Sequence, residues 1–142
     1  MTNTSEEGIS CTLTVTQTFT KNRIADLLTS ALEGGSNYWY CIDKEQSVEP
    51  PEIDPVLMPG ESTFFHLHWP LSDGGSVCFF DRETDEDERE HWYLDLAAIA
   101  RGLQVMADEH PGHLADFANE NDDAETGDVF LQCCLFGELV FG

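Results

Sequence analysis

The residues with the clearest chemical character in this chain are carboxylates, and more than half of them lie in one stretch. Residues 81–128 hold 16 of the 28 acids and only 3 of the 6 bases, a net charge of −13. Carboxylates at this density imitate the phosphates of a nucleic acid, and they steer an acidic protein toward a basic groove. The pattern predicts a surface that competes with nucleic acid for such a groove on another protein.

Most of the carboxylates in this stretch are candidate partner contacts. They are Asp81, Glu83, Asp85, Glu86, Asp87, Glu88, Glu90, Asp108, Glu109, Asp116, Glu120, Asp122, Asp123 and Glu125. If one helix continues through residues 116–123, then Asp116, Glu120 and Asp123 form a stripe on one face with steps of about 6 Å. The alternative interpretation is an acidic surface that only confers solubility or tolerance of high salt.

Two histidines could do a different chemistry. His66 and His68 fall in an expected strand, residues 63–69, which would turn both imidazoles to one side of the sheet. Such a pair can give two ligands to zinc or iron, with a third from a neighbouring strand or the acidic stretch. The alternative is two ordinary half-buried histidines. Because no third ligand is fixed, we expect no metal and no other cofactor.

Two further segments have a functional and a structural interpretation. Residues 119–128 suggest a calcium loop, but the central glycine and terminal glutamate of that motif are missing. The segment is otherwise a helix entry in which Thr126 and Asp128 supply cap oxygens. The string GGSNYW (34–39) is either an exposed aromatic contact patch or a helix end followed by a buried strand.

The composition excludes several partners. The net charge is −22, so duplex DNA, RNA and anionic lipid are not expected to bind directly. The chain is 41% hydrophobic and 11% aromatic, which is typical of a folded domain rather than a charged disordered chain. The polar, acidic start lacks the features of a signal peptide, and no apolar run is long enough to span a membrane.

The five cysteines indicate a reducing compartment. They are odd in number, none shows C-x-x-C spacing, and most are flanked by apolar or β-forming residues. This pattern is typical of reduced, buried thiols, so a cytoplasmic location is expected. The chain contains neither a G-x-S-x-G element nor a phosphate loop. We therefore expect a binding protein rather than an enzyme.

The elements that must position these residues follow from periodicity and caps. Alternation predicts strands, helical spacing after Thr20 and Asp95 predicts capped helices, and clustered prolines predict a long connection. The expected strands are 11–19, 38–42, 63–69, 76–80 and 91–94; the helices are 20–35, 96–109, 113–119 and 126–137; the connection is 43–62 and an acidic loop is 81–90.

These elements predict an α+β fold. We expect an antiparallel sheet of four to five strands with three to four helices packed on one face. Residues 1–8 would be a flexible leader, and residues 9–142 a single domain. The apolar segment 136–142 would be tucked into the domain or form a homodimer interface.

Two strings of the chain resemble known proteins. ADLLTSALEGGSNYW (25–39) and DDAETGDVFLQCCLFGELVFG (122–142) resemble small acidic proteins of unassigned function from bacteriophages and mobile elements. The resemblance implies a bacterial host cytoplasm. Proteins of that setting include inhibitors of host nucleases and CRISPR complexes, some of which are DNA mimics. Two alternatives stay open, a metal-binding protein or metal-dependent enzyme, and a structural or assembly module.

Overall fold

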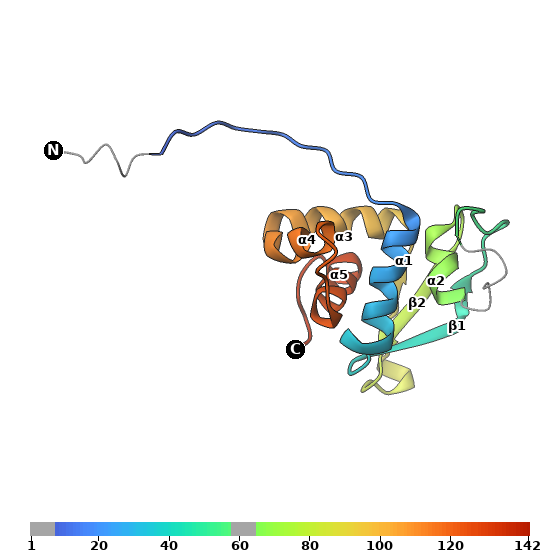
Figure 1. Cartoon of the computed structure of the whole chain (residues 1–142). Coiled ribbons are helices and arrows are strands. Elements are labelled where there is room, and N and C mark those ends of the chain that lie inside the picture. The colour runs from blue at the N-terminus through green and yellow to red at the C-terminus, as the bar shows by residue number, and fades with distance from the viewer. Residues whose placement is uncertain (1–7, 58–64) are drawn as a thin grey trace.

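A three-stranded antiparallel sheet forms one layer of the protein, and helices form the other (Figure 1). The computed structural model describes residues 8–57 and 65–142. The strands are β1 (Tyr40–Val48), β2 (Ser76–Asp81) and β3 (Trp92–Leu94), in the order β1-β2-β3. This arrangement confirms the expected α+β class.

The register of the sheet decides which side chains face the helices. Phe79 lies opposite Ile42 on β1 and opposite Trp92 on β3, so the three side chains share one face. Phe79 is fully buried, and Ile42 and Trp92 pack at the edge of the same core. The aromatic ring of Trp92 meets that of Phe136 on the last helix at 4.7 Å. The core therefore lies between this face and the helices, as expected.

The first helix forms where its sequence predicts. In α1 (Lys21–Ser30), the side chain of Thr20 accepts a hydrogen bond from the backbone N–H of Arg23, and this caps the helix. Ile24, Leu27 and Leu28 form its buried stripe. The helix continues as one π-helical turn, η2 (Ala31–Gly35), and then ends.

The other three long helices also match their expected positions. Asp95 caps α3 (Leu96–Glu109) by accepting from the N–H of Ala98 at 2.8 Å. Next come α4 (Pro111–Ala118) and α5 (Ala124–Phe136). Gly137 ends α5 in the left-handed conformation, with φ of 74°. Helix α5 is buried along most of its length, which explains why its sequence is apolar on almost every face.

The expected strand at 63–69 is wrong where the structure describes it. Residues 58–64 lie outside the described part of the chain, and the rest form a short helix, α2 (Phe65–His68), followed by a 3-10 turn, η3 (Trp69–Leu71). Pro70 lies at the start of this turn, where its missing backbone N–H costs no hydrogen bond. Strand β2 pairs instead with β1, which runs through residues 43–48 of the expected connection.

The expected strand at 11–19 is also wrong. Residues 8–20 form neither helix nor strand, and they run out from the start of α1 (Figure 1). No strand of the described residues lies beside them to complete a ladder, so their alternation has no partner. The sheet thus has three strands instead of four or five, and α2 raises the helices to five. We call residues 9–20 the arm.

Candidate functional site

The acidic loop 82–91 joins β2 to β3 at the lower end of the molecule in Figure 1. Asp81 shapes its first turn: its carboxylate accepts the N–H of Glu83 at 2.9 Å, and its carbonyl accepts the hydroxyl of Thr84 at 2.7 Å. A single 3-10 turn, η4 (Glu86–Glu88), occupies the middle of the loop. The expectation of an irregular acidic loop is therefore confirmed.

Both bases of this loop are turned toward the protein. The guanidinium of Arg82 donates to the carbonyl of Asn37, and its backbone N–H donates to the carbonyl of Trp39 at 2.9 Å. The guanidinium of Arg89 lies 4.0 Å from the centre of the Phe80 ring, a cation–π contact. Neither base neutralises a neighbouring carboxylate.

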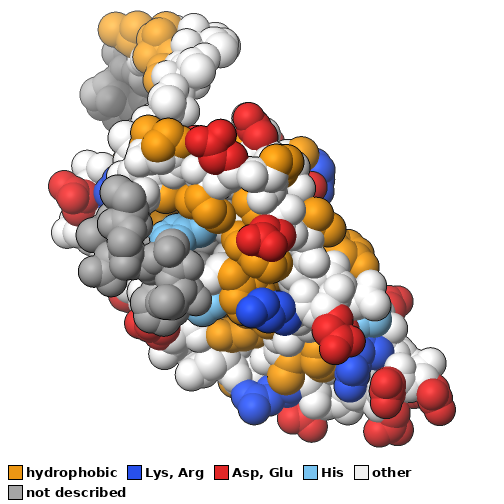
Figure 2. Space-filling view, turned by 90° about the vertical axis from the view of Figure 1, so that its right-hand side faces the viewer, with side chains coloured by type: hydrophobic (Ala, Val, Ile, Leu, Met, Phe, Trp, Pro, Cys, Tyr) orange, Lys and Arg blue, Asp and Glu red, His pale blue; other side chains and the backbone are white. Residues whose placement is uncertain are grey.

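The carboxylates of the loop are mostly exposed. All six predicted contacts in the loop are exposed, whereas Asp81, the last residue of β2, is half-buried and shapes the turn. The exposed ones are Glu83, Asp85, Glu86, Asp87, Glu88 and Glu90. None of them belongs to an ion pair within residues 8–57 and 65–142. Figure 2 shows acidic side chains at the lower end of its face, with basic side chains among them at the surface.

The remaining predicted contacts lie elsewhere. Asp108 and Glu109 are exposed at the end of α3, and Asp116 is exposed on α4. Figure 1 places α4 at the upper left, well apart from the loop. The fold does not bring the fourteen carboxylates into one cluster.

The expected stripe of Asp116, Glu120 and Asp123 is wrong. Helix α4 ends at Ala118, and Glu120 adopts a left-handed conformation with φ of 59°, so no helix connects the three residues. Residues 119–123 are not helical, so the three carboxylates lack the regular helical spacing that a stripe requires.

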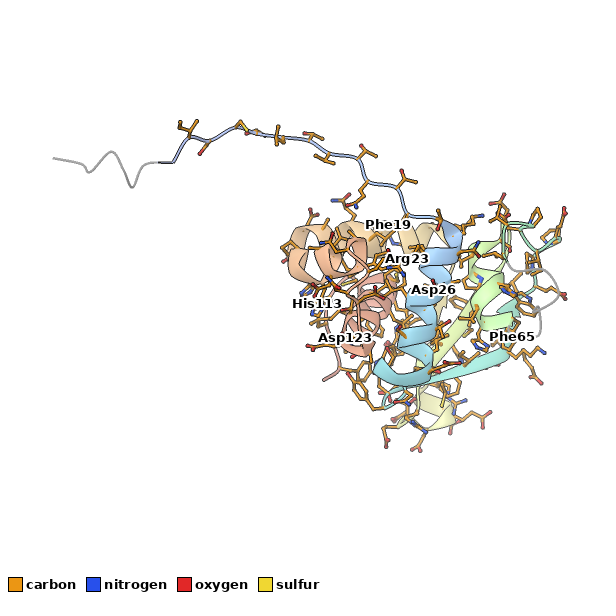
Figure 3. The ribbon with its side chains drawn as sticks, in the orientation of Figure 1. Phe19, Arg23, Asp26, Phe65, His113 and Asp123 are labelled. Atoms are coloured by element: carbon orange, nitrogen blue, oxygen red, sulfur yellow. The ribbon has the colours of Figure 1, made fainter. Side chains whose placement is uncertain are left out.

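Two acids near this turn have structural roles instead. Asp122 is half-buried and binds the guanidinium of Arg23 at 3.0 Å. Arg23 also donates to the carbonyl of Phe117 and lies 4.4 Å above the ring of that residue, which ties α1 to the end of α4 (Figure 3). Asp123 is exposed but caps α5, accepting the N–H of Thr126 at 3.0 Å. Glu125, in the first turn of α5, remains exposed.

The cap shifts the ionisation of Asp123. Hydrogen bonds from the backbone and hydroxyl of Thr126 hold the pKa of the Asp123 carboxyl below its usual value, and nearby His113 acts in the same direction. The imidazole of His113 lies 3.2 Å from the Thr126 hydroxyl. The cap therefore comes from Asp123, and not from Thr126 and Asp128 as the sequence suggested.

The histidine pair is not arranged as a metal site. His66 and His68 lie on α2, where positions two apart diverge by about 200°, rather than on one side of a strand. His68 is buried, and burial lowers the pKa values of both imidazoles. Across the described residues, no group of three or more histidine, cysteine or acidic side chains could hold a metal ion. This includes residues 119–128, for which the sequence also suggested a calcium loop.

The most densely connected carboxylate is one that sequence reasoning did not select as a contact. Asp128, on α5, accepts hydrogen bonds from the hydroxyls of Ser36 at 2.7 Å and Tyr38 at 2.8 Å, and from the indole of Trp39 at 2.9 Å. The amide of Gln132 donates to it at 3.1 Å. Burial and the adjacent Asp128 carboxylate raise the pKa of Tyr38 to about 12.

The Asp128 cluster also holds the C-terminal residues of the chain, through Gln132. The side-chain oxygen of Gln132 accepts the backbone N–H groups of Val140 and Phe141 at 2.7 and 2.8 Å. The ring of Phe141 stacks on Trp39, with 4.7 Å between centres and 5° between planes. Segment 136–142 is therefore tucked into the domain only through Phe136 and Phe141, while Leu139 and Val140 stay exposed. One signal in the sequence was Gln132 itself, a polar residue inside an apolar helix.

The string GGSNYW now has a structural explanation. Trp39 is buried, which rules it out as an exposed contact, while Tyr38 is 47% exposed. Gly35 must lack a side chain because a Cβ there would overlap the carbonyl of Ala124 at the start of α5. The string therefore brings the end of η2 against α5 and supplies three of the donors to Asp128.

The cysteines fit the expected reduced thiols in part. All five are free; Cys78, Cys133 and Cys134 are buried, Cys41 is half-buried and Cys11, on the arm, is exposed. Burial raises the pKa of Cys133 to about 11, which leaves its thiol unreactive.

The geometry defines an acidic α+β domain with an exposed carboxylate loop and a polar cluster that closes its core. Comparisons with protein-family models, curated proteins and solved structures find no match to this chain. None of the helices in residues 8–57 and 65–142 is both long and apolar enough to cross a membrane.

Proposed function

We propose that this protein binds a basic groove of a host nucleic-acid-handling protein, such as a nuclease or CRISPR complex, and inhibits it by taking the place of nucleic acid. The observation that supports the proposal is that the exposed carboxylates of loop 82–91 form no ion pair in the described residues, although the loop contains two bases. Six exposed carboxylates stand outside while Arg82 and Arg89 contact the sheet side. The loop therefore presents negative charge that its own bases do not neutralise.

Most of the bases outside this loop also contact groups of the protein itself. Lys21 pairs with Asp54, Arg23 with Asp122, and Lys44 lies 5.0 Å from the centre of the Phe65 ring. Among the six bases, only Arg101 is exposed without such a contact in the described residues. Nucleic acid and anionic surfaces meet an unfavourable field, whereas a basic protein surface meets a favourable one.

A rigid base supports the loop. Asp81 accepts hydrogen bonds from the Glu83 N–H and the Thr84 hydroxyl. The backbone N–H of Arg82 donates to the carbonyl of Trp39, so the first turn is held to the end of the sheet. A loop fixed at its base loses less conformational freedom on binding than an unstructured acidic tail of the same charge. This favours specific binding over general solubility as the role of its carboxylates. The resemblance to phage proteins points to a bacterial partner in the cytoplasm.

Capture from a bacterial lysate tests the proposal. The tagged protein is immobilised in about 0.1 M salt, and bound proteins are eluted either with about 0.5 M salt or with duplex DNA, since both weaken contacts between carboxylates and a basic groove. We expect the same nucleic-acid-binding protein in both eluates. Its activity on nucleic acid should then fall when the purified acidic protein is added. A partner that is indifferent to salt and DNA contradicts the proposal.

Two variants make this experiment specific to the loop. E86Q/D87N/E88Q removes three charges from η4, and we expect it to lose the partner. E45Q/E49Q/E52Q removes three exposed charges from residues 45–52 and should retain it. Equal loss in both variants would indicate a general charge effect and not a loop that fits a groove.

A structural or assembly role is the second candidate. The exposed, uncharged arm is an observation that favours it, because such arms connect subunits in assemblies. Presence of the protein in purified particles, together with an empty capture from the lysate, would support that role instead.

A further inference from the structure

The arm is an uncharged segment of a very acidic chain. Its twelve residues, 9–20, contain no charged side chain, no glycine and no proline, although a quarter of the whole chain is charged. Apolar and threonine side chains alternate along it, which gives a strand-like segment with one apolar face. The apolar face includes Ile9, Cys11, Leu13 and Val15.

This apolar face is open to solvent. Ile9 is fully exposed, and Leu13 and Val15 are 77% and 80% exposed. Figure 3 shows the side chains of the arm standing clear of the body of the protein. Large apolar side chains that recur on one face of an extended segment favour burial against another surface. In an isolated chain, these residues gain nothing from being apolar.

A matching hollow lies at the root of the arm. It has a volume of about 350 Å³ between the arm, α3 and α4. Its lining contains no charged residue, and consists of Val15, Gln17, Phe19, Ala100, Leu103, Gln104, Ala107 and Leu114. Two exposed charged residues of α3 flank the lining: Arg101 follows Ala100, and Asp108 accepts a hydrogen bond from the Gln104 amide at 3.1 Å.

The arm cannot fill this hollow in its own chain. Val15, Gln17 and Phe19 already form one wall of it, and residues before them continue outward from the body (Figure 1). An arm that fills the hollow must therefore come from another molecule. A second copy offers the same apolar face, carried by residues 9–13.

Charge favours a second copy at this place. Two chains of charge −22 repel each other over most of their surfaces, and they approach most easily where acids are few. The arm and the hollow are both uncharged, so each suits the other across a two-fold axis. The six arm residues on the apolar side and the five helix residues of the hollow supply 11 contact residues per chain, fewer than the roughly 20–30 a side of a stable interface, so the dimer should be a weak one.

We propose that the protein forms a homodimer by reciprocal exchange of arms, in which Ile9, Cys11 and Leu13 of each copy occupy the hollow between the partner's arm root, α3 and α4. The threonine face of each arm stays in solvent. This interface differs from the homodimer through segment 136–142 that the sequence suggested. It does not depend on the function proposed for loop 82–91, which lies apart from it.

The mass of the full chain in solution tests the exchange. Light scattering in about 0.5 M NaCl, where repulsion is screened, should give twice the 15.9 kDa of one chain. Leu13→Glu should weaken the dimer by more than about tenfold in Kd, because a carboxylate would enter an apolar hollow. Thr14→Glu adds the same charge on the opposite face and should leave a dimer. Both variants should keep the circular dichroism and melting temperature of the monomer fold, since the arm lies outside the core.

Crosslinking separates exchange from other arrangements. The exposed thiol of Cys11 and a thiol introduced by Gln104→Cys, in the hollow, should be joined by a short bismaleimide into a species of two chains, and Cys11→Ser should prevent it. A link formed only within one chain would overturn the proposal. A monomeric wild-type chain at about 100 μM, or a dimer that survives Leu13→Glu unchanged, would do the same.

Discussion

The indole N–H of Trp39 donates to the carboxylate of Asp128 at 2.9 Å, joining residues that are 89 positions apart in the chain. Through this carboxylate, the segment that follows α1 is held against α5, and Gln132 extends the network to residues 140 and 141. Two side chains of α5, Asp128 and Gln132, therefore connect this helix to two segments that no regular secondary structure joins to it. The side chains of Trp39 and Gln132 are buried where these segments meet.

Replacing this carboxylate should cost stability. In Asp128→Ala, the buried indole of Trp39 and the hydroxyl of Ser36 lose their acceptor, and we expect a loss of about 2–4 kcal/mol in the free energy of unfolding. Asp128→Asn keeps one acceptor oxygen and should lose less. Urea denaturation followed by tryptophan fluorescence measures both. The exposed Asp116→Ala is the control and should unfold at the wild-type midpoint; an unchanged midpoint in Asp128→Ala would refute the network's role.

The cap of α5 should make stability depend on pH. The pKa of Asp123 is lowered in the folded protein, so the ionised carboxylate stabilises the fold above its ordinary unfolded value of 3.8, and this contribution is lost as the pH falls through the folded value. Asp123→Ala should lose about 1 kcal/mol at pH 7, and the difference from wild type should shrink below pH 4. Urea titrations at pH 7, 5 and 3 measure the difference. Asp123→Asn keeps the cap oxygen, so a loss in that variant as large as in the alanine variant would contradict the capping argument.

Loop 82–91 should be important for binding and unimportant for folding. Its exposed carboxylates repel one another and pair with no base in the described residues, so E86Q/D87N/E88Q should fold with a stability within about 0.5 kcal/mol of wild type, or slightly above it. The melting temperature of the wild type should rise with added salt, and that of the variant should rise less. A variant that is strongly destabilised would show that these acids have structural roles, and would remove the main support for a binding loop.

Local signals explain which elements were predicted correctly from the sequence. Helix α3 has the expected bounds, because the cap at Asp95 and the apolar spacing both lie within the segment itself. Strand β2 and the C-terminal glycine of α5 are similar cases. Each of these elements is determined by residues only a few positions apart.

The errors come from partners that are distant in the sequence. Alternation at residues 11–19 and 63–69 predicts strands only if another strand lies alongside, and β2 pairs with β1 and β3 instead. Asp128 was one acid among 28, and its donors at positions 36–39 come near it only in the folded chain. The acidic residues themselves were correctly expected to be exposed for the most part, but their division between two ends of the molecule follows from the fold.

Close contacts of α5 with its neighbours should make two glycines irreplaceable. A Cβ on Gly102 of α3 would overlap the sulfur of Cys134, and a Cβ on Gly127 of α5 would lie 2.6 Å from the backbone nitrogen of Ala31. Because backbone atoms cannot move aside cheaply in a packed core, Gly102→Ala and Gly127→Ala should each lose about 1–3 kcal/mol or more. Gly112→Ala, in the first turn of α4 with no atom within 4 Å of the added Cβ, is the matched control. Since alanine is the better helix former, that control should be neutral or stabilising by up to about 1 kcal/mol. Thermal unfolding of the three variants at one salt concentration measures these changes; equal effects at all three positions would mean that α5 does not pack as closely against α3 and the end of α1 as these distances require.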